Sequence, residues 1–117
     1  MQTVILDTNA LLMPFERKMN LDLELQRLLG TARVVVPAPL IGELERSYNK
    51  HAKAALALAA KYEVVPSTAW GDDAVLELAL ELGAFVLTND KELRSRLRPH
   101  RIPLIYLRSG SHLILER

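Results

Sequence analysis

Short apolar runs alternate with helix-like segments along the whole chain, and this alternation limits the fold more than any other feature. The runs read as buried strands, and the expected strands are residues 3–6, 33–36, 63–65, 84–87 and 102–107. Strands that alternate with helices indicate right-handed βαβ crossovers and a mostly parallel sheet with helices on both faces. The pattern therefore predicts an α/β fold, with residues 112–115 as a candidate edge hairpin.

The segments between the strands carry the caps and the apolar periodicity of helices. The expected helices are residues 10–15 with Pro14 as an interruption, 21–29, 39 to about 48, 50–61, 71–82 and 90 to about 97. Thr8 or Asn9 is expected to cap the first helix, and Asn89 the last. The neighbouring Asp7 and Asp90 are then left free for another role.

Composition sets further limits. The 117 residues suffice for one domain, which we expect to span residues 1–117. No apolar stretch approaches the ~18 residues that a membrane span requires, so we expect no membrane partner. Cysteine is absent, which excludes disulfides and thiolate metal sites and fits a cytoplasmic location.

Four acidic residues, Asp7, Glu43, Asp72 and Asp90, each lie just past one of the predicted strands. The carboxyl ends of parallel strands share one edge of a sheet, so these side chains are expected to converge. Carboxylates packed together repel one another unless protons or cations compensate them. Because Mg²⁺ prefers oxygen ligands, the pattern predicts a site for Mg²⁺ or Mn²⁺ and metal-dependent phosphodiester chemistry.

Each acid also has an ordinary structural explanation. Asp7 could cap a helix, and Glu43 could be a solvated residue in mid-helix, with Glu45 as its rival on the opposite side. Asp73 adjoins Asp72 and is the alternative candidate for the third of the four acids. The metal hypothesis depends on the recurrence of acids after successive strands, and a purely structural cluster of acids remains the alternative.

Basic residues gather after the fourth predicted strand, where they form a candidate set for binding a polyanion: Lys91, Arg94, Arg96 and Arg98. A solvated helix face explains the arginines equally well when they are considered alone. Trp70 could stack on a base, although a packing role in the core or at its rim is favoured.

Three motifs together resemble the PIN-domain nucleases: residues 4–9 with Asp-Thr-Asn, residues 36–44, and residues 86–90 with Thr-Asn-Asp. The resemblance implies a three-layer α/β/α PIN-like fold with a five-stranded, mostly parallel sheet of order 3-2-1-4-5. It also implies Mg²⁺- or Mn²⁺-dependent cleavage of single-stranded RNA by attack of an activated water. The metal-binding acids of the family match Asp7, Glu43, Asp72 and Asp90, and its supporting residues match Thr8, Asn9 and Thr88.

The compact sequence is most similar to the PIN endonucleases of ribosomal RNA processing and their archaeal relatives, and next to toxins of the VapC type. These implied roles predict single-stranded RNA as substrate, a homodimer, and either a ribosome-assembly partner or an antitoxin. Beside a nuclease site, contact of the basic set (Lys91, Arg94, Arg96 and Arg98) with an RNA backbone becomes the better explanation. The alternatives are a PIN module that binds RNA without cleaving it and a receiver-like phosphoacceptor domain. A receiver-like domain would need paired aspartates after the first strand and a lysine after the last strand, and this sequence has neither.

Overall fold

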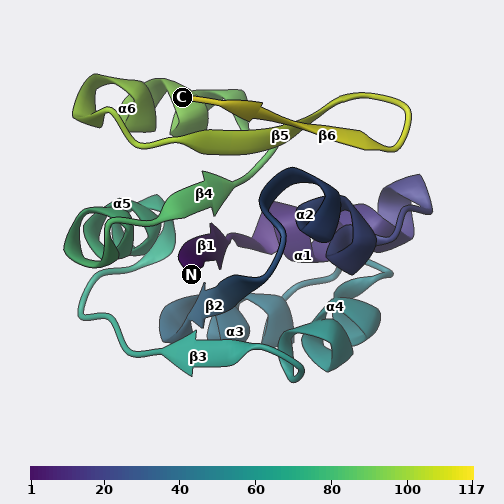
Figure 1. The fold of residues 1–117 in the computed structure, drawn as a ribbon. Coiled ribbons are helices and arrows are strands. Elements are labelled where there is room, and N and C mark those ends of the chain that lie inside the picture. The colour runs from purple at the N-terminus through teal and green to yellow at the C-terminus, as the bar shows by residue number, and fades with distance from the viewer.

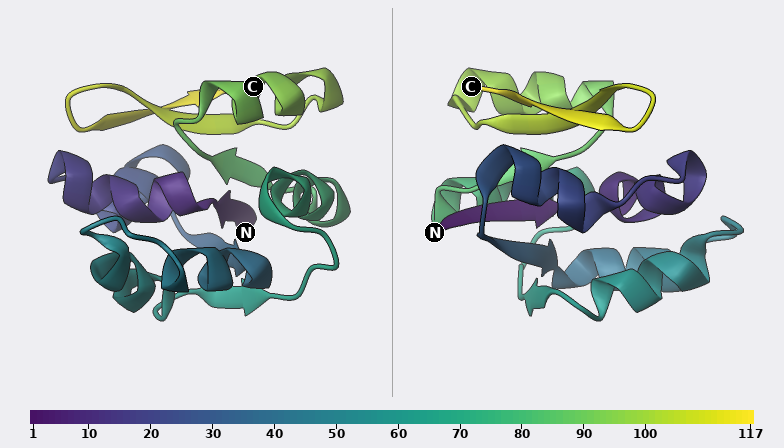
Figure 2. Two further views of the ribbon diagram at one scale, coloured as in Figure 1. Left: turned by 180° about the vertical axis from the view of Figure 1, so that it is seen from behind. Right: turned by 45° about the vertical axis from the view of Figure 1, so that its right-hand side comes forward.

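The computed structural model describes residues 1–117 and shows a six-stranded sheet with helices on both sides (Figures 1 and 2). The strands are β1 (Gln2–Leu6), β2 (Ala32–Pro37), β3 (Glu63–Val65), β4 (Phe85–Leu87), β5 (Leu104–Ser109) and β6 (His112–Glu116). The helices are α1 (Thr8–Arg17), α2 (Leu21–Leu29), α3 (Ala38–Glu45), α4 (Ala52–Ala59), α5 (Gly71–Leu82) and α6 (Lys91–Leu97), followed by the 3₁₀ helix η1 (Arg98–His100). This is the three-layer α/β/α arrangement that the sequence predicts.

The strand order is β3-β2-β1-β4-β5-β6, and every neighbouring pair is parallel except β5 with β6. The predicted order 3-2-1-4-5 is therefore confirmed. The predicted number of five strands is wrong by one, because the candidate hairpin pairs fully with β5 and becomes the edge strand β6. None of the helices is long and apolar enough to cross a bilayer.

The centre of the sheet is its most deeply buried part. Val4, Ile5 and Leu6 of β1 have no exposed surface, and the same is true of Val86 and Leu87 of β4. Both faces of these strands are covered by helices, so their sequences are continuous apolar runs without alternation. The buried apolar side chains form one cluster of 29 residues, which fixes β1 and β4 side by side.

Helix α1 differs from the prediction, because it runs from Thr8 to Arg17 straight through Pro14. Proline removes one backbone donor inside a helix, and we expected it to interrupt the segment. The helix continues because Leu11 and Met13 are buried just before the proline and Phe15 packs against the core just after it. It ends beyond the proline, at Lys18, whose backbone is left-handed with a φ of 52°. Helices α3 and α4 are shorter than predicted at their adjoining ends.

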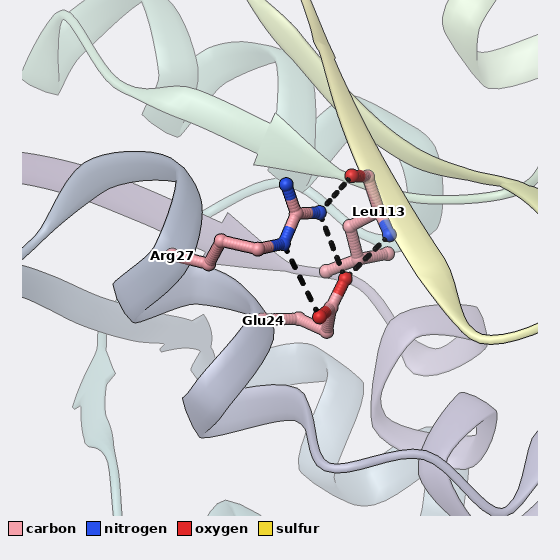
Figure 3. Close-up of polar contacts among 3 residues, drawn as sticks. All are labelled: Glu24, Arg27 and Leu113. Carbon is pink, nitrogen blue, oxygen red and sulfur yellow. Dashed lines mark hydrogen bonds and ion pairs between the residues drawn. The ribbon is translucent and has the colours of Figure 1, made fainter.

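A pair of side chains from α2 covers part of the free edge of β6 (Figure 3). The N–H of Leu113 donates to Glu24 Oε1 at 2.8 Å, and the carbonyl of Leu113 accepts from Arg27 Nη2 at 2.6 Å. Glu24 and Arg27 also bond to each other at 2.9 Å. Unpaired backbone groups on an edge strand invite pairing with other chains, and this side-chain pair satisfies two of them.

We predict that Glu24→Ala accelerates hydrogen exchange of the Leu113 amide. Loss of one hydrogen bond of ordinary net strength corresponds to an increase of about five- to tenfold. Exchange measured by NMR tests this, with Glu45→Ala on α3 as the matched control. An unchanged Leu113 rate in Glu24→Ala would show that the side chain does not protect the edge.

Candidate functional site

Asp7 lies at the carboxyl end of β1 and is almost completely buried, with 5% of its surface exposed. Its Oδ1 accepts from the N–H of Ala10 at 2.7 Å, so Asp7 itself is the N-cap of α1. The prediction that Thr8 or Asn9 would cap this helix is wrong. The chain turns into the helix directly after the strand, which leaves Asp7 as the residue that can reach the first free N–H groups.

Thr88 joins Asp7 to the neighbouring strand. Its fully buried hydroxyl donates to Asp7 Oδ2 and accepts from the backbone N–H of Asp90 at 3.0 Å. A hydroxyl can donate and accept at once, so this one residue orients the Asp7 carboxylate and the turn that carries Asp90. Thr8, also expected to support the acids, makes no side-chain hydrogen bond within the chain.

Asp90 caps α6, because its Oδ1 accepts from the N–H of Leu93 at 3.0 Å. The prediction that Asn89 would take this position is wrong. Asn89 instead accepts from the N–H of Leu107 on β5 at 2.7 Å, and its own N–H donates to Asn9 Oδ1 at 2.8 Å. These contacts hold the turn after β4 between α1 and β5. The sequence offers only a strand-ending asparagine as a signal for this role.

Asp72 and Asp73 both lie in the first turn of α5, but they have different neighbours. Asp73 forms an ion pair with Arg96 at 2.7 Å. Partial burial raises the pKa of the Asp72 carboxyl, and the charge of Asp90 raises it further, while Arg96 opposes both effects. Asp72 is therefore the acid of this pair that faces Asp90.

Glu43 is half-buried in α3 and has no hydrogen bond or ion pair within the chain. Its charge is not among the main causes of the raised pKa of Asp7 or Asp72. The structure therefore links Asp7, Asp72 and Asp90 electrostatically, and it gives Glu43 no such link. The role of Glu43 stays a prediction from the family motif.

The basic residues after β4 are mostly engaged within the chain. Arg96 pairs with Asp73, and Arg98 binds Glu116 at 2.8 Å. The Arg94 guanidinium lies 4.1 Å from the centre of the Tyr106 ring. Lys91 is exposed at the start of α6 and has no ion pair. That these four residues bind RNA stays a prediction. Lys91 is the member of the set that has no partner within the chain.

Trp70 is 68% exposed, so the interpretation of this residue as part of the core is wrong. It directly precedes α5 and lines a cleft of about 360 Å³ between α3 and the loop that follows β3. The sequence pattern alone did not reveal its exposure, because a tryptophan beside a helix start is equally typical of packing and of binding.

The chain compensates the negative charge of these acids only in part. Burial raises the pKa of Asp7 to about 7, and the charges of Asp72 and Asp90 add to this effect against the hydrogen bonds from Thr88 and Ala10. No three histidine, aspartate or glutamate side chains are grouped so as to hold a metal ion by themselves. An open site with one or two carboxylates and several waters is, however, the usual environment of Mg²⁺. The donor set therefore fits a hard divalent cation.

We predict that Asp7→Asn makes the metal-free protein more stable at neutral and alkaline pH. The folded protein holds the Asp7 proton up to a pH of about 7, whereas the unfolded chain releases it near 3.8. The wild type should therefore lose stability as the pH rises between these values, by up to about 4 kcal/mol. Urea unfolding in EDTA at several pH values measures this difference. Parallel pH profiles for the two proteins would contradict it.

Comparison with known proteins places this site in a family. A family model described as "PIN like domain" matches residues 4–110. "Ribonuclease VapC4" of Methanocaldococcus jannaschii is 35% identical to the chain, over 96% of the chain and 95% of that protein. "Ribonuclease VapC9" of Archaeoglobus fulgidus is 29% identical, over 96% of the chain and 87% of that protein.

Solved structures agree with these matches. The one titled "Structure of the PIN domain endonuclease Utp24" superposes with a TM-score of 0.86 at 26% identity, over 98% of this chain and 91% of that one. A domain of a functionally unknown protein from M. jannaschii superposes with a TM-score of 0.60 at 16% identity, over 97% and 96% of the two chains, and supports the fold alone. The chain belongs to the PIN-like domain family.

Proposed function

We propose that this protein is a divalent-metal-dependent endoribonuclease that cleaves single-stranded RNA. The observation that carries the proposal is the group of Asp7, Asp72 and Asp90 at one edge of the sheet, whose charges raise one another's pKa values and are offset only in part by Arg96. The names of the relatives support the substrate, since two are called ribonucleases and the structural neighbour an endonuclease.

In this proposal the cation, Mg²⁺ or Mn²⁺, binds among Asp7, Asp72 and Asp90, with one or two carboxylates in direct contact and bound waters reaching the others. Glu43 completes the site on the side of α3. When bound, such a cation supplies Lewis-acid chemistry: it offsets charge on the scissile phosphate and makes water a better nucleophile at neutral pH. Thr88 keeps the Asp7 carboxylate in one orientation through its hydroxyl. Asn9 and Asn89 support the same geometry, because they fix the turn from which Asp90 projects.

The raised pKa of the buried Asp7 carboxyl is consistent with this role. A carboxyl with a pKa of about 7 is half-protonated at neutral pH in the metal-free protein. A nearby divalent cation favours the charged form, so cation binding and release of this proton are coupled. We infer that the site gains its full negative charge as the cation enters it.

Two biological roles remain from the family resemblance. One is ribosomal RNA processing with a ribosome-assembly partner, which the resemblance to compact PIN endonucleases implies, and the similarity to a PIN domain endonuclease agrees with it. The other is a VapC-type toxin with an antitoxin partner, and the names of the two sequence relatives favour it. Growth arrest on expression that Asp90→Asn abolishes would support the toxin role. A homodimer is compatible with both roles.

We predict that the purified protein cleaves an unstructured RNA with Mn²⁺ and that EDTA abolishes the cleavage. Asp90→Asn should lower the rate by about 100-fold or more, because it removes a ligand charge, and Thr88→Val by about 10- to 100-fold, because it removes an orienting hydroxyl. Asparagine can still cap α6, so Asp90→Asn should leave the fold intact.

Asp73→Asn is the matched control for these variants, since Asp73 adjoins Asp72 but pairs with Arg96. It should retain most of the activity. Gel assays of an end-labelled RNA, together with circular dichroism of each variant, measure these effects. Cleavage that survives EDTA, or an Asp90→Asn variant as active as the wild type, would refute the metal mechanism.

A further inference from the structure

Trp70 is the single tryptophan of the chain, and it lies on the surface. Scattered exposed apolar residues are normal in soluble proteins, so exposure alone carries little weight. Trp70, however, borders the cleft of about 360 Å³ between α3 and the loop that follows β3. Its indole therefore offers a flat aromatic surface at the rim of a hollow.

Arg46 lines the same cleft and is the one charged residue among its lining groups. Its side chain folds back over Gly42, one helical turn earlier on α3. A Cβ at position 42 would lie 3.2 Å from Arg46 Nη1 and 3.5 Å from Nη2, so glycine leaves the space that the guanidinium occupies. Arg46 makes no side-chain hydrogen bond or ion pair within the chain. Its five donors are available to a ligand.

The cleft adjoins the acids of the proposed nuclease site. Trp70 precedes Asp72 by two residues, a separation of at most about 7 Å along the backbone. Gly42 is next to Glu43 in α3, and α3 packs against α5, which carries Asp72. A strand of nucleic acid that reaches the acids therefore passes close to Trp70 and Arg46.

We propose that this cleft binds one unpaired nucleotide of the RNA substrate, with its base stacked on Trp70 and a phosphate bound by Arg46. The assignment rests on the proposed function, since it places the nucleotide beside the scissile phosphate. An aromatic face accepts any base, whereas a paired base is covered by its neighbours in the duplex. The free guanidinium suits a phosphate, because it can donate two parallel hydrogen bonds. The cleft therefore selects single strands without selecting a sequence.

Fluorescence of the single tryptophan tests this directly in the wild-type protein. A short oligouridylate is added in EDTA, so that binding is measured without cleavage. Stacking should quench the Trp70 emission in a saturable manner. An oligomer of the same length with abasic residues keeps the phosphates and lacks the bases, and it should give little quenching. Equal quenching by both oligomers, or none by the oligouridylate, would overturn the assignment.

Variants test the two contacts separately, with anisotropy of a labelled oligouridylate as the measurement. Trp70→Leu should weaken binding by about 5- to 150-fold, the equivalent of one stacked base, while Trp70→Phe should restore much of it. Arg46→Ala should weaken binding and reduce the slope of log affinity against log salt by about 0.7, the equivalent of one phosphate contact. The controls are Tyr48→Leu and Arg17→Ala, which replace exposed residues outside the cleft and should bind as the wild type does.

The same assays separate this inference from the proposed function. Trp70→Leu binding as tightly as the wild type would overturn the stacking site, whatever the nuclease activity proves to be. Base-dependent quenching in a protein that cleaves no RNA with Mn²⁺ would instead overturn the proposed catalysis and leave the binding site standing.

Discussion

The hydrogen bond from Thr88 to Asp7 is the contact on which the rest of the site depends. It joins the carboxyl ends of β1 and β4, and both of its residues are buried. A carboxylate in such surroundings is costly, because burial disfavours its charged form and two more acids face it. An acid that costs stability at this place agrees with the proposed requirement for negative charge.

The architecture explains why the acids lie at one edge of the sheet. Parallel neighbours β2, β1 and β4 end on the same side, so the segments that follow them, α3, α1 and the turn into α6, begin there. The buried strands β1 and β4 fix the positions of Asp7 and Asp90. The cap hydrogen bonds at the starts of α1 and α6 fix the orientation of their carboxylates. Both aspartates stabilise the fold as helix caps. In the proposed function they are also metal ligands, since capping engages only one oxygen of each carboxylate.

The strand order and the positions of Asp7 and Asp90 after β1 and β4 could be predicted, since apolar runs and the rules of parallel sheets determine both. The caps could not, because Asp7, Thr8 and Asn9 all have side chains able to cap, and tertiary contacts decide among them. Asn9 and Asn89 instead link α1, the turn after β4, and β5, which adjoin only in space. The exposure of Trp70 and the ion pairs of Arg96 and Arg98 depend on partners far away in the sequence, which local patterns do not reveal.

The proposed function requires the buried Asp7 carboxyl to belong to a cation site. A carbon-13 NMR titration of the Asp7 carboxyl with and without Mg²⁺ tests this requirement. The pKa should be about 7 in the absence of the ion and markedly lower in its presence. A pKa in the ordinary range of aspartate, or one that Mg²⁺ leaves unchanged, would contradict it.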